Sequence, residues 1–570
     1  MSDEGIGSTV GPDQDPQAGA QAAAEADGVA GVQAGVLRSS GGMAVGTIVS
    51  RITGVVRDIL LSAALGVGVL ADTFTTANTL PNIIYILAVG GALNAVFVPQ
   101  LVRHARSDSD GGDGYADRLL TLVGLVLLGV TVLAVALAPW IVGLYGRSFD
   151  TQDLAVSAAF ARYCLPQILF YGIFTMLTQV LNSRGSFAAP AYAPVANNLV
   201  MSAAAILFLH TVGLDPTTAT ISSSEIALLG IGATLGVAVQ AIVLIPFAWR
   251  VGYHWRPRFD FRGHGLGHAW RLARWTIAFV AVNQVTYLVI VNLANAANVL
   301  AQDNGGVSAG FASYTRAHLL FILPHSVVTV SLAAALLPRM SAAAHAGDLR
   351  GVGADVAQGL RTASAFVVPT AAALVLLGPR ITQVLTAYGS TSQAEAAQIG
   401  VVVQMFALGL VPFTVFYLAL RGYFALENTR TPFWLNVVLN LLNAAFALTL
   451  YLVVPDSFKV PALALGYSLA YVVTAVVTWQ RLGRRLGGLE THQTVRTLVR
   501  LALAAGLACV PAYVVAVGLT HALGTTNLAT LLQLLAALVA GGAAFVWLAL
   551  RMRVTEVSEL ITLLAGRVSR

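Results

Sequence analysis

The sequence predicts an all-α polytopic membrane protein with about 14 transmembrane helices. Of its 570 residues, 57% are hydrophobic and only 10% are charged, whereas soluble domains carry about 25% charged residues. Apolar runs of about 20 residues, long enough to cross a hydrocarbon core of about 30 Å, recur along the chain. We place the spans near 43–66, 72–102, 119–145, 154–181, 187–212, 226–249, 272–299, 307–337, 362–386, 396–420, 431–454, 460–480, 497–519 and 527–550.

The distribution of basic residues supports this count and orients the chain. With the amino terminus placed in the cytoplasm, most of the 32 Lys and Arg residues fall in cytoplasmic loops, as the positive-inside rule requires. An even number of spans preserves this alternation, so we expect both termini in the cytoplasm. The exceptions are Arg147, Arg380 and Lys459 in outer loops, and Arg51, Arg57, Arg162 and Arg316 within spans.

Four regions are expected along the chain. Residues 1–37 are acidic and contain no Lys or Arg, which predicts a disordered cytoplasmic tail. Leu80-Pro81 in the second span and Leu323-Pro324 in the eighth lie about 240 residues apart in the same orientation. A repeat of this kind predicts two pseudo-symmetric six-helix bundles. They would occupy residues 38–250 and 251–485, with two additional transmembrane helices and a short cytoplasmic tail in 486–570.

The sequence lacks the motifs of several other classes. It has no Gly-Lys-Ser/Thr phosphate loop, no His-Glu-x-x-His and no nucleophile elbow, so we predict no catalytic residue and no enzyme activity. Cys164 and Cys509 cannot build a disulfide framework or a metal cluster, and no cofactor or metal is expected. The basic residues follow membrane topology, so the pI of 9.4 does not indicate a nucleic-acid partner.

Three charged residues, Arg51, Arg57 and Asp58, interrupt the first span. A charge near the bilayer centre costs about 2.5–3.5 kcal/mol and is tolerated mainly against a cavity or a partner. The span therefore predicts a polar interior, and its two arginines favour an anionic passenger. Two alternatives stay open: Arg51 snorkels to the interface, or Arg57 pairs with Asp58 or Asp72 as a structural bridge.

The second span carries a polar stripe on an apolar helix. It begins at Asp72, and Asn78, Asn82 and Tyr85 follow at i, i+4 and i+7. The amides either contact the passenger or join helices through hydrogen bonds. The eighth span carries a second polar patch, which consists of Tyr314, Arg316, His318 and His325. Its two histidines are either neutral packing residues or proton carriers.

The second span also contains residues that permit bending, namely Pro81 and the Gly90-Gly91 pair. We expect this span to move during transport, with Asp72 near its outer end closing against the opposite bundle. The alternative role of the glycines is tight helix packing.

Six motifs carry a family resemblance. They are Ser50-Arg-Ile-Thr-Gly-Val-Val-Arg-Asp58, Ala71-Asp-Thr-Phe74, Leu80-Pro-Asn82, Phe97-Val-Pro99, Ala189-Pro-Ala-Tyr-Ala-Pro194 and Leu336-Leu-Pro-Arg-Met-Ser341. The chain resembles the MurJ/MviN family over roughly residues 40–550. These proteins are lipid II flippases of the multidrug, oligosaccharidyl-lipid and polysaccharide exporter superfamily.

The resemblance implies that the chain carries lipid II, a lipid-linked peptidoglycan precursor, from the inner to the outer leaflet of the bacterial cytoplasmic membrane by alternating access. An arginine-lined cavity would face the pyrophosphate, and Asp58 and Asp72 would orient the arginines or pair with them when the cavity is empty. Five residues of this chain fall at positions that are functional in the family: Arg51, Arg57, Asp58, Asp72 and Asn82. Our candidate substrate-binding set adds Asn78, Tyr85 and Arg316.

The chain also departs from the family pattern. A second-span arginine of better-known members falls at Tyr85, and an eighth-span arginine falls at Leu319, with Arg316 one turn earlier. The seventh and eleventh spans carry amides instead of the acids through which some members bind sodium. We therefore expect the membrane potential, rather than sodium, to bias the transport cycle.

Two rival functions stay open. An exporter of small cationic drugs would place acids in the cavity. A non-transporting scaffold for cell-wall synthesis would tolerate cavity substitutions. The expected partners are lipid II and membrane lipid, with cell-wall synthases as further candidates.

Overall fold

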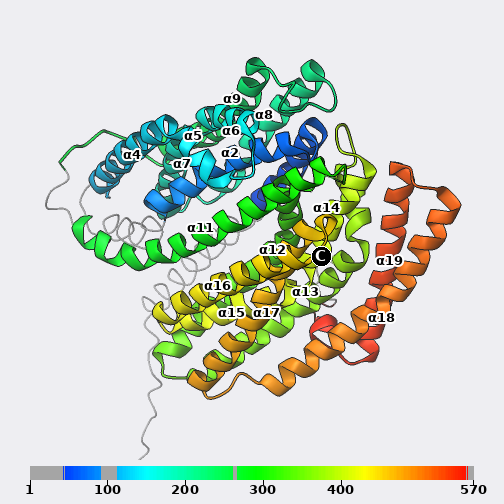
Figure 1. Ribbon diagram of the computed structural model, residues 1–570. Helices are drawn as coiled ribbons and strands as arrows, with labels where there is room; N and C mark the ends of the chain where they lie inside the picture. The colour runs from blue at the N-terminus through cyan, green and yellow to red at the C-terminus, as the bar shows by residue number, and fades with distance from the viewer. Residues whose placement is uncertain are drawn as a thin grey trace, which may run out of the picture.

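The computed structural model describes residues 43, 45–90, 112–260, 266–307, 309–559 and 562. The predicted tail 1–37, Gly91 and the Phe97-Val-Pro99 motif lie outside these residues. Within the described chain every regular element is a helix, which confirms the all-α prediction (Figure 1).

The first half of the chain begins with a helix over residues 45–65, here called the first helix. It continues with α2 (Val69–Tyr85), the π-helical segment η1 (Ile86–Gly90), α4 (Asp113–Ala136), α5 (Ala138–Tyr145), α6 (Thr151–Cys164), α7 (Gln167–Ser183), α8 (Ala188–Val212), α9 (Ser223–Ile242) and α10 (Leu244–Arg250).

The second half begins with two long helices, α11 (Leu266–Asp303) and α12 (Phe311–His345). The elements that follow are α13 (Leu349–Thr386), α14 (Gln393–Ala407), α15 (Leu410–Ala425), α16 (Arg430–Val453), η3 (Asp456–Phe458), α17 (Lys459–Leu486), α18 (Thr491–Leu523) and α19 (Asn527–Arg551).

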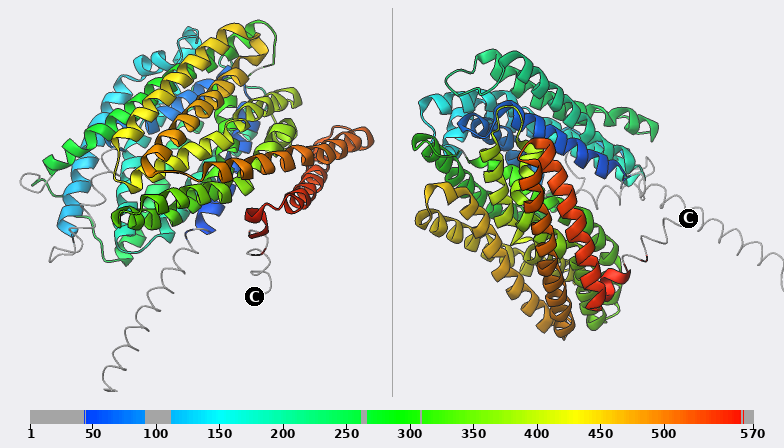
Figure 2. Two further views of the ribbon diagram at one scale, coloured as in Figure 1. Left: turned by 90° about the horizontal axis from the view of Figure 1, so that it is seen from below. Right: turned by 90° about the vertical axis from the view of Figure 1, so that its right-hand side faces the viewer.

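The helices form two groups with a separate pair at one side. The first group contains α2 and α4–α9, and the second contains α12–α17, with the long α11 running between them (Figure 1). The last two helices, α18 and α19, pack against each other and against α13. Figure 2 shows this pair on the outside of the second group.

Helices occupy the predicted membrane-crossing positions throughout the described part of the chain. Eleven described helices are long and apolar enough to cross, and the bent pair α14–α15 makes a twelfth span. The other two predicted spans are the first helix, with its three charged residues, and α2, which has 17 residues and is followed by η1.

One interruption recurs in both halves, although the first half has two further breaks, between α4 and α5 and between α9 and α10, where α13 and α17 of the second half are continuous. In the first, the span Thr151–Ser183 is broken between α6 and α7 at Leu165 and Pro166. In the second, α14 and α15 are bent by 45° around Leu408 and Gly409. These two breaks lie at the same place in the helix order, which agrees with the predicted internal repeat.

The segment that follows α10 is tied to the base of α4. The Tyr253 hydroxyl and the Arg256 backbone N–H both donate to Asp117 Oδ1, at 3.0 and 3.1 Å. Arg118 Nη2 donates to Asp260 Oδ2 at 2.6 Å, and this guanidinium lowers the pKa of the Asp260 carboxyl. The start of the connection between the halves is therefore fixed to the first half.

Candidate functional site

A polar cavity of about 270 Å³ lies between the two halves. The first helix contributes Arg57 and Asp58, α2 contributes Asn78, and α12 of the second half contributes Arg316. The described lining residues therefore include two cationic side chains and one anionic side chain, which gives them a net positive charge. Its other polar lining residues are Thr75, Thr79, Gln167, Tyr171, Asn197 and Thr315.

Arg57 is held by two partners in this cavity. Its Nε and Nη2 donate to Asp58 Oδ1 at 3.1 and 2.9 Å, and its Nη1 donates to Asn198 Oδ1 at 3.1 Å. The Asn198 amide in turn donates to the Ser50 carbonyl and the Thr53 hydroxyl of the first helix, both at 3.0 Å. The side chains of Arg57 and Asp58 stay 30% and 24% exposed, so the pair retains access to a ligand.

Arg316 enters the same cavity from the opposite half. Its Nη1 donates to the Gly66 carbonyl at 2.8 Å, and the carboxylates of Asp58 and Asp72 interact with its charge. Leu319, where the resemblance places a family arginine, also lines this cavity. The cationic wall thus receives one arginine from each half.

A second cavity of about 420 Å³ adjoins the first, because Arg57, Asp58 and Asn197 line both. It extends along the first helix to Arg51 and Thr47, and Thr47 lies about 15 Å from Arg57 by helix rise. Arg51 is exposed here. The two cavities form a path toward the start of the first helix.

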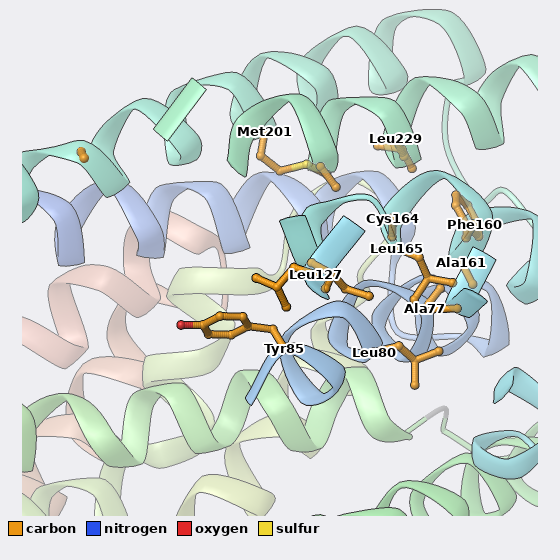
Figure 3. Packing of buried hydrophobic residues seen from close by; sticks show 14 of the residues in the cluster. Ala77, Leu80, Tyr85, Leu127, Phe160, Ala161, Cys164, Leu165, Met201 and Leu229 are labelled. Carbon is orange, nitrogen blue, oxygen red and sulfur yellow. The ribbon is translucent and has the colours of Figure 1, made fainter. Parts of the chain in front are cut away.

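The polar stripe of α2 is divided among different environments. Asn78 Oδ1 accepts from Gln167 Nε2 at 3.0 Å and lines the first cavity. Asn82 is exposed and lines a third cavity of about 370 Å³. Tyr85 lines none of these cavities: it is buried, and its hydroxyl donates to Thr175 Oγ1 at 2.9 Å. Figure 3 shows its ring beside the apolar core of the first half.

Asp72 lies outside the cavities, at a contact between the halves. It is fully buried, and its Oδ2 accepts from Asn298 Nδ2 while its Oδ1 accepts from the backbone N–H of Ala312, both at 2.7 Å. We expected Asp72 to orient the arginines. Asp72 interacts with Arg316 through its charge, whereas its hydrogen bonds go to Asn298 and to the backbone at Phe311 and Ala312.

Other residues near Asp72 also join the two halves and, together with it, close the cavity on this side. We call this set of contacts the closed layer. Its residues are Ser62, Ala63, Gly66, Asp72, Asn298, Gly310, Ala312, Gly389, Ser390 and Thr391. Ser62 Oγ lies 3.0 Å from Thr391 Oγ1, and the Ser390 N–H donates to the Ala63 carbonyl at 2.9 Å. Gly389 has a φ of +60°, and a Cβ there would overlap the Ala63 carbonyl. The closed layer joins the first helix and α2 to the second half.

Sequence reasoning missed several residues of the site. Asn198, Gln167 and Asn298 are amides within apolar helices, and that is the signal that marked Asn78 and Asn82. Ser390 and Thr391 lie in a short polar loop and carry no comparable signal. Within the described residues, no group of three or more His, Cys, Asp or Glu side chains is placed to hold a metal ion.

These features define the class of protein. Two repeated helical bundles that enclose a polar cavity, with a sealed layer on one side of it, are the architecture of an alternating-access transporter. Comparison with known proteins identifies the family: the family model described as "Lipid II flippase MurJ" matches residues 61–536 of this chain. The chain therefore belongs to the MurJ lipid II flippase family, as the sequence motifs predicted.

Named relatives and solved structures agree with this assignment. A probable lipid II flippase MurJ of Rhizobium meliloti is 26% identical, over 76% of this chain and 79% of the relative. The lipid II flippase MurJ of Burkholderia cenocepacia is 27% identical, over 68% and 72%. A solved "Lipid II flippase MurJ, inward closed conformation" has a TM-score of 0.69 at 18% identity, covering 90% of this chain and 99% of that one.

The fold is also shared more widely. An inward-facing multidrug transporter of the MATE family has a TM-score of 0.61 at 15% identity, covering 77% of this chain and 96% of that one. At this level of identity the likeness concerns the fold alone.

Proposed function

We propose that this protein moves lipid II from the inner to the outer leaflet of the cytoplasmic membrane by alternating access. The observation that carries this proposal is the pairing of Arg57 and Arg316, which reach one net-positive cavity from opposite halves of the chain. Membership of the MurJ family supplies the substrate class.

The proposed ligand of the two arginines is the pyrophosphate of lipid II. Guanidinium groups match phosphate oxygens in a bidentate fork, and such charge-assisted bonds are about twice as strong as neutral ones. Asp58 occupies part of the donor set of Arg57. When pyrophosphate binds, it would take over these donors, and Asp58 would stay close enough to hold Arg57 in place.

The cycle follows from the position of the closed layer. With the predicted topology, this layer faces the outside and the path past Arg51 faces the cytoplasm. Substrate would enter along that path, and breaking the closed layer would release it to the outer leaflet. Both termini would then be cytoplasmic. Cell-wall synthases that consume the product are proposed partners.

The charge of the cavity favours this function over its rivals. An exporter of cationic drugs needs a negative site, whereas this wall carries two arginines and one aspartate. A scaffold without transport gives no reason to keep two arginines at a shared cavity, where desolvation costs free energy.

The test is loss of function at Arg57 in cells depleted of the native protein. Arg57→Ala should insert normally but reduce outward-facing lipid II at least tenfold, and Arg57→Lys should recover only part of it because lysine lacks the fork. Arg350→Ala, at an exposed arginine outside the cavities, is the matched control and should transport normally. Normal transport by Arg57→Ala would refute the proposal.

A further inference from the structure

The third cavity differs chemically from the first two. Its volume of about 370 Å³ falls in the range of roughly 300–1,000 Å³ found for small-ligand sites. Among the described residues, no Asp, Glu, Lys or Arg side chain lines it, and one imidazole, that of His318, does. Its wall combines amides with aromatic rings: Asn82 of α2, Asn283 and Gln284 of α11, Asn443 of α16, Tyr287 of α11 and Tyr467 of α17.

Several of these amides have unused hydrogen-bonding capacity. Gln284 Oε1 and Asn443 Oδ1 are buried and have no partner among the described residues. Asn82 is exposed, and no hydrogen bond joins its side-chain amide to another described residue. Buried acceptors are normally paired, so this wall is suited to a ligand that donates and accepts hydrogen bonds without carrying charge.

Other side chains keep the wall in shape. Asn440 Nδ2 donates to Asn283 Oδ1 at 3.0 Å and to the Asn436 carbonyl at 2.9 Å. The Tyr287 ring lies edge-on to Phe311, with centroids 5.9 Å apart. The cavity is therefore preorganised, and its tyrosine rings offer flat apolar surfaces between the amides.

The third cavity also adjoins the arginine cavity. Thr79 of α2 and Thr315 of α12 line both. A ligand with its anionic group at Arg57 and Arg316 would therefore place the next part of its headgroup among the amides.

We infer that the third cavity is the subsite for the N-acetylated sugars of the substrate, an inference that rests on the proposed function. Sugar hydroxyls and acetamido groups need both donors and acceptors, which amide side chains provide, and the apolar faces of sugar rings pack on tyrosine. The neutral wall selects the sugar, and the arginines hold the pyrophosphate.

The experiment compares two lipids that differ in the sugar. The full-length protein in lipid nanodiscs is titrated with peptide-free lipid II, in which the sugars are present and the peptide has been removed, and with undecaprenyl pyrophosphate, which lacks both. Asn82→Leu and Gln284→Met remove an amide with little change of shape. The double variant should bind peptide-free lipid II about tenfold more weakly, because each lost neutral hydrogen bond weakens binding about threefold. It should bind undecaprenyl pyrophosphate within twofold of the parent.

Retained binding of undecaprenyl pyrophosphate reports that the variant is folded. Gln404→Met is the matched control, because this amide bonds the Val375 carbonyl outside the three cavities; it should bind both lipids normally. Unchanged binding of peptide-free lipid II in the double variant would overturn the inference, and so would an equal loss for both lipids. If Arg57→Ala binds both lipids normally, the proposed function fails while the sugar subsite is judged by the double variant alone.

Discussion

The closed layer and the arginine cavity lie between the same two halves, yet they are built from different residues. In the closed layer the contacts are made by glycine, serine, a buried carboxylate and backbone groups, and Asp72 is fully buried with both oxygens paired. In the cavity the lining includes long charged side chains from both halves, and Arg57 stays 30% exposed. Small residues let the backbones meet, whereas the arginines preserve a polar space.

This difference indicates how the transporter can reverse its opening. One hydrogen bond makes a net contribution of about 0.5–1.5 kcal/mol to stability. The few hydrogen bonds of the closed layer therefore stabilise the state in which this layer is closed by several kcal/mol. Shifting a two-state equilibrium from 1:99 to 99:1 takes about 5.5 kcal/mol. The seal is therefore of a size that substrate binding can overcome. A substitution in it should alter the balance of states according to how many of these hydrogen bonds it removes.

The largest effect is expected from locking the closed layer. Ser62 and Thr391 are buried with their hydroxyl oxygens 3.0 Å apart, so Ser62→Cys with Thr391→Cys should form a disulfide under oxidant. Outward-facing lipid II should then fall at least tenfold, and reduction with dithiothreitol should restore it. Ser62→Cys alone should be insensitive to oxidant. Full transport by the crosslinked protein would show that this layer does not open.

Preventing the layer from closing should have the next largest effect. Gly389→Ala adds a Cβ that overlaps the Ala63 carbonyl, at a φ of +60°. With Thr391→Cys as a reporter, labelling from outside by an impermeant maleimide should become about tenfold faster. Gly347→Ala is the matched control, since Gly347 has a φ of +76° and open space around its Cα. If Gly347→Ala accelerates labelling as much as Gly389→Ala does, then backbone strain, and not the overlap with the Ala63 carbonyl, causes the faster labelling.

A smaller shift is expected from Asp72→Asn. The amide keeps one acceptor oxygen and turns an NH₂ toward either the Asn298 amide or the Ala312 N–H. One donor loses its partner, which costs about 1–3 kcal/mol. Labelling of the same reporter should accelerate by about fivefold or more. Asp355→Asn, at an acid paired with Arg339, should not change the rate, and an unchanged rate in Asp72→Asn would remove Asp72 from the seal.

The smallest effect should come from Asn292 on α11. Its amide donates to the Leu144 carbonyl at 2.8 Å and its Oδ1 accepts from the Arg147 N–H at 3.2 Å, but this contact is partly exposed and water can replace it. Asn292→Ala should change the labelling rate by less than threefold, whereas Asn298→Ala, at a fully buried amide, should change it more. The reverse order would mean that burial does not set the strength of the contacts between the two halves.

The sequence alone predicted the membrane spans, the internal repeat and a polar interior lined by Arg57 and Asp58. Long apolar runs and the free-energy cost of a charge in the bilayer are local properties, so Arg57 and Asp58 could be assigned to a polar interior before any fold was known. The sequence also limited the candidate ion-pair partners of Arg57 to Asp58 and Asp72. Asp58 is indeed its ion-pair partner.

Only the tertiary structure decided which polar residues line the cavity and which seal it. A helix that is apolar on most sides does not fix its own rotation, so the spacing of Asn78, Asn82 and Tyr85 could not show that they lie in three different environments. Nor could it pair Ser62 with Thr391, 329 residues away, or Asp72 with Asn298. Those contacts form because the two bundles pack together, and packing between distant segments is not encoded in local patterns.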